Sequence, residues 1–148
     1  MFLGSRIAES DIINKTLAER GGAIAPLIAE TGGQNAMIVD NSALPEQVVD
    51  DILVSGFQSA GQRCSALRIL YLQDGIADRV IKMLNGAAQE LVIADPMYLS
   101  TDVGPVIDAP SLKMLQEHSE KLDKIAKCVA KAPLPDHLQE KGYFFAPR

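Results

Sequence analysis

Apolar residues along the chain occur in two patterns, as short continuous runs and as longer stretches with a helical period. The short runs have the length of strands and lie at residues 24–29, 36–39 and 66–72. The stretches with helical spacing lie at residues 7–17, 45–57, 76–91 and 112–125. Because strands and helices alternate, the sequence predicts an α/β layered fold in which helices flank the strands.

Three local features refine this prediction. The nearly continuous apolar run 66–72 indicates a strand in the middle of a sheet. Ser42 is the predicted cap of the helix at 45–57, and Pro45 suits the first turn of that helix. The segment 130–141 contains prolines and is expected to be irregular.

Composition and charge argue against several classes of protein. The 148 residues are 47% hydrophobic and 22% charged, which is typical of a globular domain. With a net charge of −5 and no cluster of lysine and arginine, the chain is not expected to bind nucleic acid. No apolar run approaches the roughly 20 residues that span a bilayer, so no transmembrane segment is expected. Two cysteines and two histidines, well separated, indicate no disulfide framework and no metal site, and they favour a reducing, cytoplasmic compartment.

The most informative stretch is a short polar turn that ends in Cys64. A predicted helix precedes the turn and a predicted strand follows it, so regular structure would hold the thiol on both sides. Thiolate is a strong nucleophile, and the neighbouring Arg63 could favour it. The alternative is that Cys64 is a small buried apolar residue.

A second stretch closes an apolar run with Glu30 and continues as Thr-Gly-Gly before the next run. Cys64 follows 34 positions later (64 − 30). A carboxylate that lies near a thiol can act as a general base. The alternative is an ordinary glutamate that faces water in a turn.

Taken together, the two stretches resemble the aldehyde dehydrogenase superfamily, in which Glu-x-Gly-Gly precedes Phe-x-x-x-Gly-Gln-x-Cys by a few tens of residues. The wording of residues 28–40 and 59–68 is closest to enzymes of proline catabolism, and in particular to the dehydrogenase module of bifunctional proline utilisation proteins. The resemblance continues through residues 101–108, and residues 142–147 look like a further family strand.

This resemblance implies an NAD-dependent oxidation of L-glutamate 5-semialdehyde, the open form of 1-pyrroline-5-carboxylate, to glutamate. Cys64 would attack the aldehyde to form a thiohemiacetal, and Glu30 would activate the water that hydrolyses the later thioester. Ser65 matches a serine that helps to hold the substrate carboxylate in the proline-catabolic branch. A turn serine that faces solvent is the alternative for Ser65.

The resemblance also implies a place for the cofactor and a division of the chain. Gly4 and Ser5 resemble the Phe-Thr-Gly-Ser segment beside the NAD pyrophosphate, although Leu3 replaces the usual threonine and a plain turn is the alternative. Residues 1–22 would end an NAD-binding domain, and residues 23–148 would form the N-terminal part of a three-layer catalytic domain. The chain would thus be a fragment of a homo-oligomeric parent enzyme.

Two other functions stay open at this point. A cysteine beside a carboxylate could serve acyl transfer without a nucleotide, and Gly4 and Ser5 argue weakly against that reaction. The chain could also be a non-catalytic folding or assembly module whose exposed apolar surfaces associate.

The sequence predicts that this 148-residue chain alone has no appreciable dehydrogenase activity. The family's upstream asparagine, which donates to the oxyanion, is missing, and so is its later Glu-x-Phe-Gly-Pro segment, which holds the nicotinamide ribose. Incubation of the purified chain with NAD and 1-pyrroline-5-carboxylate checks this, and the expected result is no NADH above background. NADH formation that Cys64→Ala abolishes would contradict the prediction.

Overall fold

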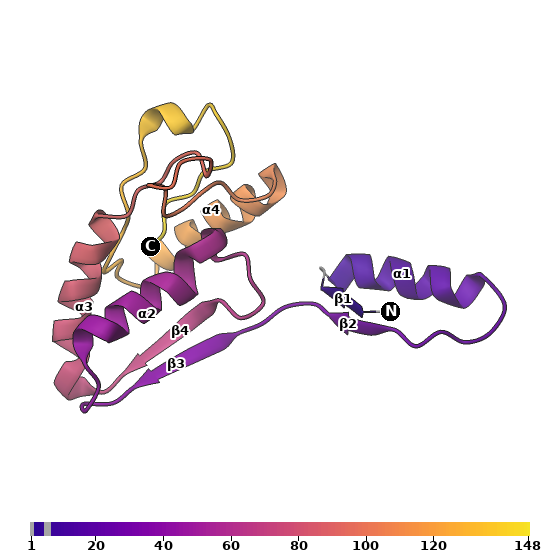
Figure 1. The fold of residues 1–148 in the computed structure, drawn as a ribbon, viewed down its shortest axis with the longest axis horizontal. Coiled ribbons are helices and arrows are strands. Elements are labelled where there is room, and N and C mark those ends of the chain that lie inside the picture. Colours follow the sequence, from indigo (N-terminus) through magenta and orange to yellow (C-terminus); the bar gives the residue numbers. More distant parts are fainter. Residues whose placement is uncertain (1, 5–6) are drawn as a thin grey trace. The chain divides into compact units, whose positions relative to one another are not determined.

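The computed structural model describes residues 2–4 and 7–148, and it divides the chain into two compact units. The first unit ends at Gln34 and the second runs from Asn35 to Arg148. Figure 1 shows the helices and strands of each unit. Within the described residues, every helix is too short or too polar to cross a lipid bilayer.

The first unit contains two short parallel strands and one helix. These are β1 (Phe2–Gly4), α1 (Ile7–Glu19) and β2 (Ile28–Glu30). The predicted strand at 24–29 therefore begins later than expected, since Pro26 precedes it and proline has no N–H for a strand ladder. The register pairs Gly4 with Glu30, so both residues lie at the carboxyl ends of neighbouring strands.

The second unit begins with two parallel strands covered by two helices. The elements are β3 (Asn35–Val39), α2 (Pro45–Phe57), β4 (Leu67–Leu72) and α3 (Asp74–Gln89). Apolar side chains from these elements form one core, in which Val80 is fully buried. The predicted α/β fold, with strands flanked by helices, is confirmed.

The position of β4 within its sheet differs from the prediction. Within the described residues, β4 pairs with β3 alone, so this sheet has two strands and both are edge strands. The side chains on the outer face are apolar yet exposed, with 82% of Ile38 and 57% of Tyr71 accessible to solvent. The apolar run at 66–72 correctly predicts a strand. It does not indicate whether other elements cover both faces of the sheet to which that strand belongs.

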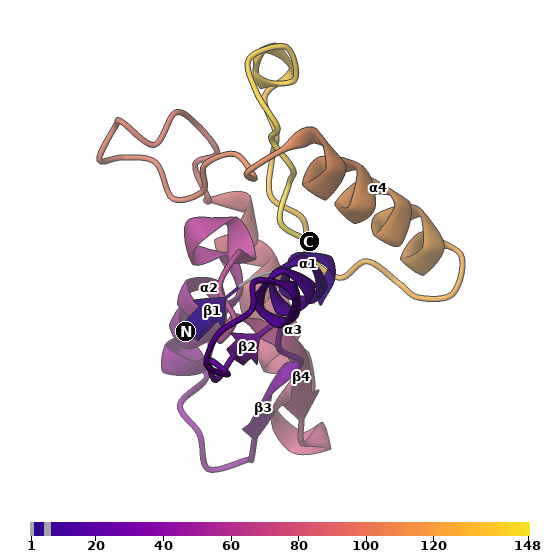
Figure 2. The same ribbon diagram turned by 90° about the vertical axis from the view of Figure 1, so that its right-hand side faces the viewer.

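The remainder of the second unit is built around a second core. It contains α4 (Ala109–Asp123), the short 3₁₀ helix η2 (Asp136–Leu138) and long connecting segments. Both views place α4 and the C-terminal segment toward one end of this unit (Figure 2). The apolar side chains that form the second core are Ile93, Val103, Ala132, Leu138, Phe144 and Ala146.

The expectation of a strand at residues 142–147 is wrong. The segment is irregular, and the N–H of Val106 donates to the carbonyl of Tyr143 at 2.9 Å. Phe144 and Ala146 are nevertheless buried in the second core. The apolar pattern of this segment therefore indicates buried side chains and not a hydrogen-bonded β-strand.

The prediction that Ser42 caps α2 is also wrong. The cap position is Leu44, and its side chain makes no capping hydrogen bond. Ser42 instead donates from both its hydroxyl and its backbone N–H to the carboxylate of Asp40, and these bonds hold the pKa of Asp40 below its ordinary value. The hydroxyl of Ser42 therefore makes a local hydrogen bond to Asp40 and does not cap α2.

The turn after α2 has an unusual backbone. In the 3₁₀ segment η1 (Gln58–Gly61), Ser59, Ala60 and Gly61 have φ angles of 55°, 52° and 67°. A left-handed conformation costs a residue with a Cβ about 1–2 kcal/mol. Packing of Ala60 on the second core helps to offset that strain. A Cβ at Gly61 would lie 2.8 Å from the carbonyl oxygen of Gly56, so a glycine is required there.

We predict that Gly61→Ala destabilises the chain by about 2 kcal/mol or more, because it adds a positive-φ penalty to a clash with backbone. The matched control is Gly86→Ala, since a Cβ at this α3 position meets nothing within 4 Å. Removing a glycine from a helix interior should stabilise the chain by about 0.5–1 kcal/mol. Urea unfolding of both variants tests this, and equal effects would contradict the account of the turn.

Candidate active site

Cys64 lies in a tight turn between η1 and β4, and its side chain is exposed. The N–H of Ala66 donates to the carbonyl of Arg63 at 3.1 Å, which places Cys64 and Ser65 at the two central positions of this turn. Ala66, the last residue of the turn, is buried. The alternative of a buried, inert cysteine is therefore not what the structure shows, and a reagent can reach the thiol.

The side chain of Asn35 holds this turn from across the sheet. Its amide nitrogen donates to the carbonyl of Cys64 at 2.7 Å and to the carbonyl of Ala66 at 3.0 Å. Asn35 is the first residue of β3, where the pairing with β4 shifts register. Sequence reasoning gave Asn35 no role, and its only signal was an asparagine at the start of an apolar run.

Two motif segments meet through Gln62. Its side-chain oxygen accepts a hydrogen bond from the N–H of Ile107 at 2.8 Å, and its amide nitrogen donates to the carbonyl of Ser59 at 3.1 Å. Ile107 belongs to the segment 101–108, which carries part of the family resemblance. Gln62 thus joins that segment to the turn that presents Cys64.

Two arginines fix the same turn to its surroundings. Arg63 donates to the carbonyl of Val54 at 3.2 Å and to the side chain of Gln58 at 2.9 Å, so its guanidinium is directed to the end of α2. Arg68 donates to the carbonyl of Gly61 at 2.5 Å. The structure shows Arg63 bonded to the end of α2, and its suggested effect on the thiolate stays a prediction.

Glu30 and Gly4 lie together in the first unit. Glu30 is exposed at the end of β2, and the β1–β2 register places Gly4 directly opposite. Helix α1 begins at Ile7, three positions after Gly4. The predicted contact of Gly4 with the NAD pyrophosphate stays a prediction. Ser5, the other predicted cofactor residue, lies outside the described residues.

The structure thus forms two local groupings from the predicted site residues. Gly4 and Glu30 share the carboxyl edge of the small sheet in the first unit. Cys64 and Ser65 share a turn in the second unit. The pairing of Cys64 with Glu30 in one catalytic pocket stays a prediction.

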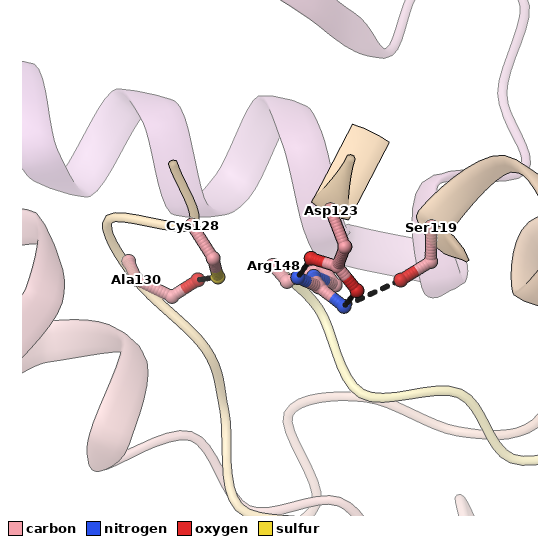
Figure 3. Close-up of polar contacts among 5 residues, drawn as sticks. All are labelled: Ser119, Asp123, Cys128, Ala130 and Arg148. Carbon is pink, nitrogen blue, oxygen red and sulfur yellow. Dashed lines mark hydrogen bonds and ion pairs between the residues drawn. The ribbon is translucent and has the colours of Figure 1, made fainter. Parts of the chain in front are cut away.

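A separate group of polar contacts lies beside the other cysteine, Cys128 (Figure 3). The guanidinium of Arg148 makes two hydrogen bonds to the carboxylate of Asp123 and one to the hydroxyl of Ser119. The bonds to Asp123, and after them the nearby Cys128, raise the pKa of Arg148 above its ordinary value. The thiol of Cys128 donates to the carbonyl of Ala130 at 3.2 Å. This cluster ties the C-terminal residue to the end of α4.

Cys128, Asp123 and Arg148 line a cavity of about 520 Å³ in the second unit, whereas Cys64 does not. The other lining side chains are mostly apolar and come from α2, η1, β4, α3, α4 and the connecting and C-terminal segments. In the part of the chain that the structure describes, no three His, Cys, Asp or Glu side chains gather as metal ligands would. The role of Cys64 as a nucleophile stays a prediction.

Comparison with known proteins shows which sequences this chain is similar to. The chain is 52% identical to the bifunctional protein PutA of Escherichia coli over 125 residues, which are 82% of this chain and 9% of PutA. It is 30% identical to 1-pyrroline-5-carboxylate dehydrogenase from a Geobacillus species over 148 residues, which are 99% of this chain and 28% of that relative.

The fold also matches known structures. A crystal structure of a mutant proline utilization A (PutA) from Bradyrhizobium japonicum superposes with a TM-score of 0.86 at 47% identity, covering 99% of this chain and 14% of that one. The chain therefore spans between 9% and 28% of the length of these three relatives. Residues 1–148 match the family description "Aldehyde dehydrogenase family" over the whole sequence, and the chain belongs to the aldehyde dehydrogenase family.

Proposed function

We propose that this chain forms part of an NAD-dependent dehydrogenase that oxidises L-glutamate 5-semialdehyde to glutamate in proline catabolism. The observation that carries the proposal is the exposed thiol of Cys64 on a turn that four side chains hold in place. The substrate assignment draws on the relative named 1-pyrroline-5-carboxylate dehydrogenase and on the resemblance to PutA.

Cys64 is the proposed nucleophile. Its thiolate attacks the aldehyde carbon, a carbon–sulfur bond forms, and the carbonyl oxygen becomes a thiohemiacetal oxyanion. The backbone N–H of Cys64 is the proposed donor to that oxygen. A turn with a fixed backbone suits this task, because a preorganised donor needs no reorientation as charge develops.

Glu30 and Ser65 are the proposed partners of Cys64 in this reaction. Glu30 accepts a proton from the water that attacks the thioester, which releases the carboxylate product and returns the thiolate. Ser65 directly follows Cys64 in the turn, so its hydroxyl can donate to the carboxylate of the semialdehyde substrate while the aldehyde reacts with the sulfur.

NAD, when bound, accepts the hydride that leaves the substrate carbon. Gly4 and Ser5 are the proposed residues beside its pyrophosphate, supported by the order of β1, glycine and α1. We also propose a cytoplasmic location, which the two free and exposed cysteines favour. A homo-oligomeric state is proposed from the family resemblance.

We predict that Cys64→Ala abolishes the reaction in a chimaera of E. coli PutA in which this chain replaces the segment that it matches. The expected fall in kcat/KM for 1-pyrroline-5-carboxylate and NAD is at least about a thousandfold, since covalent chemistry is lost. NADH formation is measured by absorbance, with unmodified PutA as the reference.

The matched control for this experiment is Cys128→Ala, which removes the other free thiol and should leave kcat/KM within about twofold. Equal losses in the two variants would contradict a nucleophilic role for Cys64. Retained NADH formation in the Cys64→Ala chimaera would overturn the proposed function. A chimaera that oxidises other aldehydes but not 1-pyrroline-5-carboxylate would overturn the substrate assignment alone.

A further inference from the structure

We propose that Asn35 is the positioning residue of the nucleophile turn, with a role that rests on the proposed function of Cys64. Its side chain is half-buried, and its two donated bonds go to the carbonyls on either side of Ser65. The carbonyl of Cys64 thus accepts a hydrogen bond from a side chain 29 positions earlier in the chain.

The chemistry of the partners fixes which way the amide faces. Both partners of Asn35 are carbonyl oxygens, which can only accept hydrogen bonds. A flipped amide would place its own oxygen against the carbonyls of Cys64 and Ala66. Both hydrogens of the amide nitrogen are thus used, and asparagine is the residue whose short side chain supplies two donors from one atom.

The backbone explains how Asn35 reaches the turn. Asn35 pairs with Leu67, whereas the next residue of β3 pairs with Ile69, so β4 carries one extra residue at Arg68. A bulge of this kind re-aims a side chain and is common beside active sites. Here the bulge lies immediately after the Cys64 turn, and the side chain at the start of β3 points across to it.

The consequence concerns the peptide group that joins Cys64 to Ser65. A bond to the carbonyl of Cys64 fixes the plane of that peptide, and the second bond fixes the end of the turn at Ala66. One amide therefore sets the orientation of both the proposed nucleophile and the proposed carboxylate donor. Asn35 itself does not touch the reacting atoms in this arrangement.

The test compares two amide-to-carboxylate changes at neighbouring positions in the 148-residue chain, Asn35→Asp and Gln34→Glu. Gln34 is exposed, so it controls for the added charge. Hydrogen–deuterium exchange is followed in peptides that cover the turn at 58–66 and, as a reference, α3. At neutral pH we expect Asn35→Asp to speed exchange in the turn by at least about tenfold, because a carboxylate cannot donate to the two carbonyls.

A pH series distinguishes positioning from a general loss of packing. When the aspartate is protonated at low pH it can donate one hydrogen bond, so protection of the turn in Asn35→Asp should return in part, after correction for intrinsic exchange. Asn35→Ala should show a loss of about tenfold at every pH, since it has no donor to recover. Gln34→Glu should match the unmodified chain throughout.

Unchanged exchange at 58–66 in both Asn35 variants would overturn the proposal. An equal rise in α3 would also overturn it, since Asn35 would then support the whole fold and not the turn. These readouts do not use catalysis, so they are separate from the test of the proposed function. If the turn loosens as expected while the Cys64→Ala chimaera stays active, the positioning holds and the nucleophile assignment fails.

Discussion

The bonds from Asn35 to the carbonyls of Cys64 and Ala66 are the constraint on which the candidate site depends. They join the start of β3 to a turn almost thirty residues further along the chain. The turn itself follows three consecutive left-handed residues, which would not persist without support from their surroundings. The strained residues 59–61 precede Cys64, and the hydrogen bonds from Asn35 hold the carbonyls of Cys64 and Ala66. Together they fix the backbone that carries the exposed thiol.

The same region explains why family motifs far apart in sequence lie close in the fold. Gln62 receives a hydrogen bond from Ile107, so the segment 101–108 supports the turn that presents Cys64. Gly61 is needed because the carbonyl of Gly56 lies where a Cβ would project. These glycines, amides and carbonyls take no part in the proposed reaction. They hold the turn that carries Cys64, the proposed nucleophile.

Sequence alone predicted the helices and most of the strands, because apolar spacing reports which side chains are buried. The prediction failed where a buried residue does not belong to a helix or strand, and where a strand residue is not buried. Phe144 is buried in an irregular segment, and Tyr71 lies on a strand whose outer face is exposed. Ser42 bonds to Asp40 and not to the helix that follows, a local competition that composition does not resolve. The role of Asn35 could not be predicted from its spacing, since its partners are backbone groups distant in sequence.

The chain belongs to the aldehyde dehydrogenase family. In the proposed reaction, Cys64 forms the bond to the substrate and Glu30 activates the water that hydrolyses the thioester, and the two residues belong to separate structural units. The most direct test is Glu30→Gln in the PutA chimaera, followed by NADH formation and by the mass of the Cys64 peptide. The account predicts a burst of about one NADH per site, then turnover slower by about a hundredfold or more, with an acyl adduct on Cys64. Steady turnover at the unmodified rate with no adduct would contradict it.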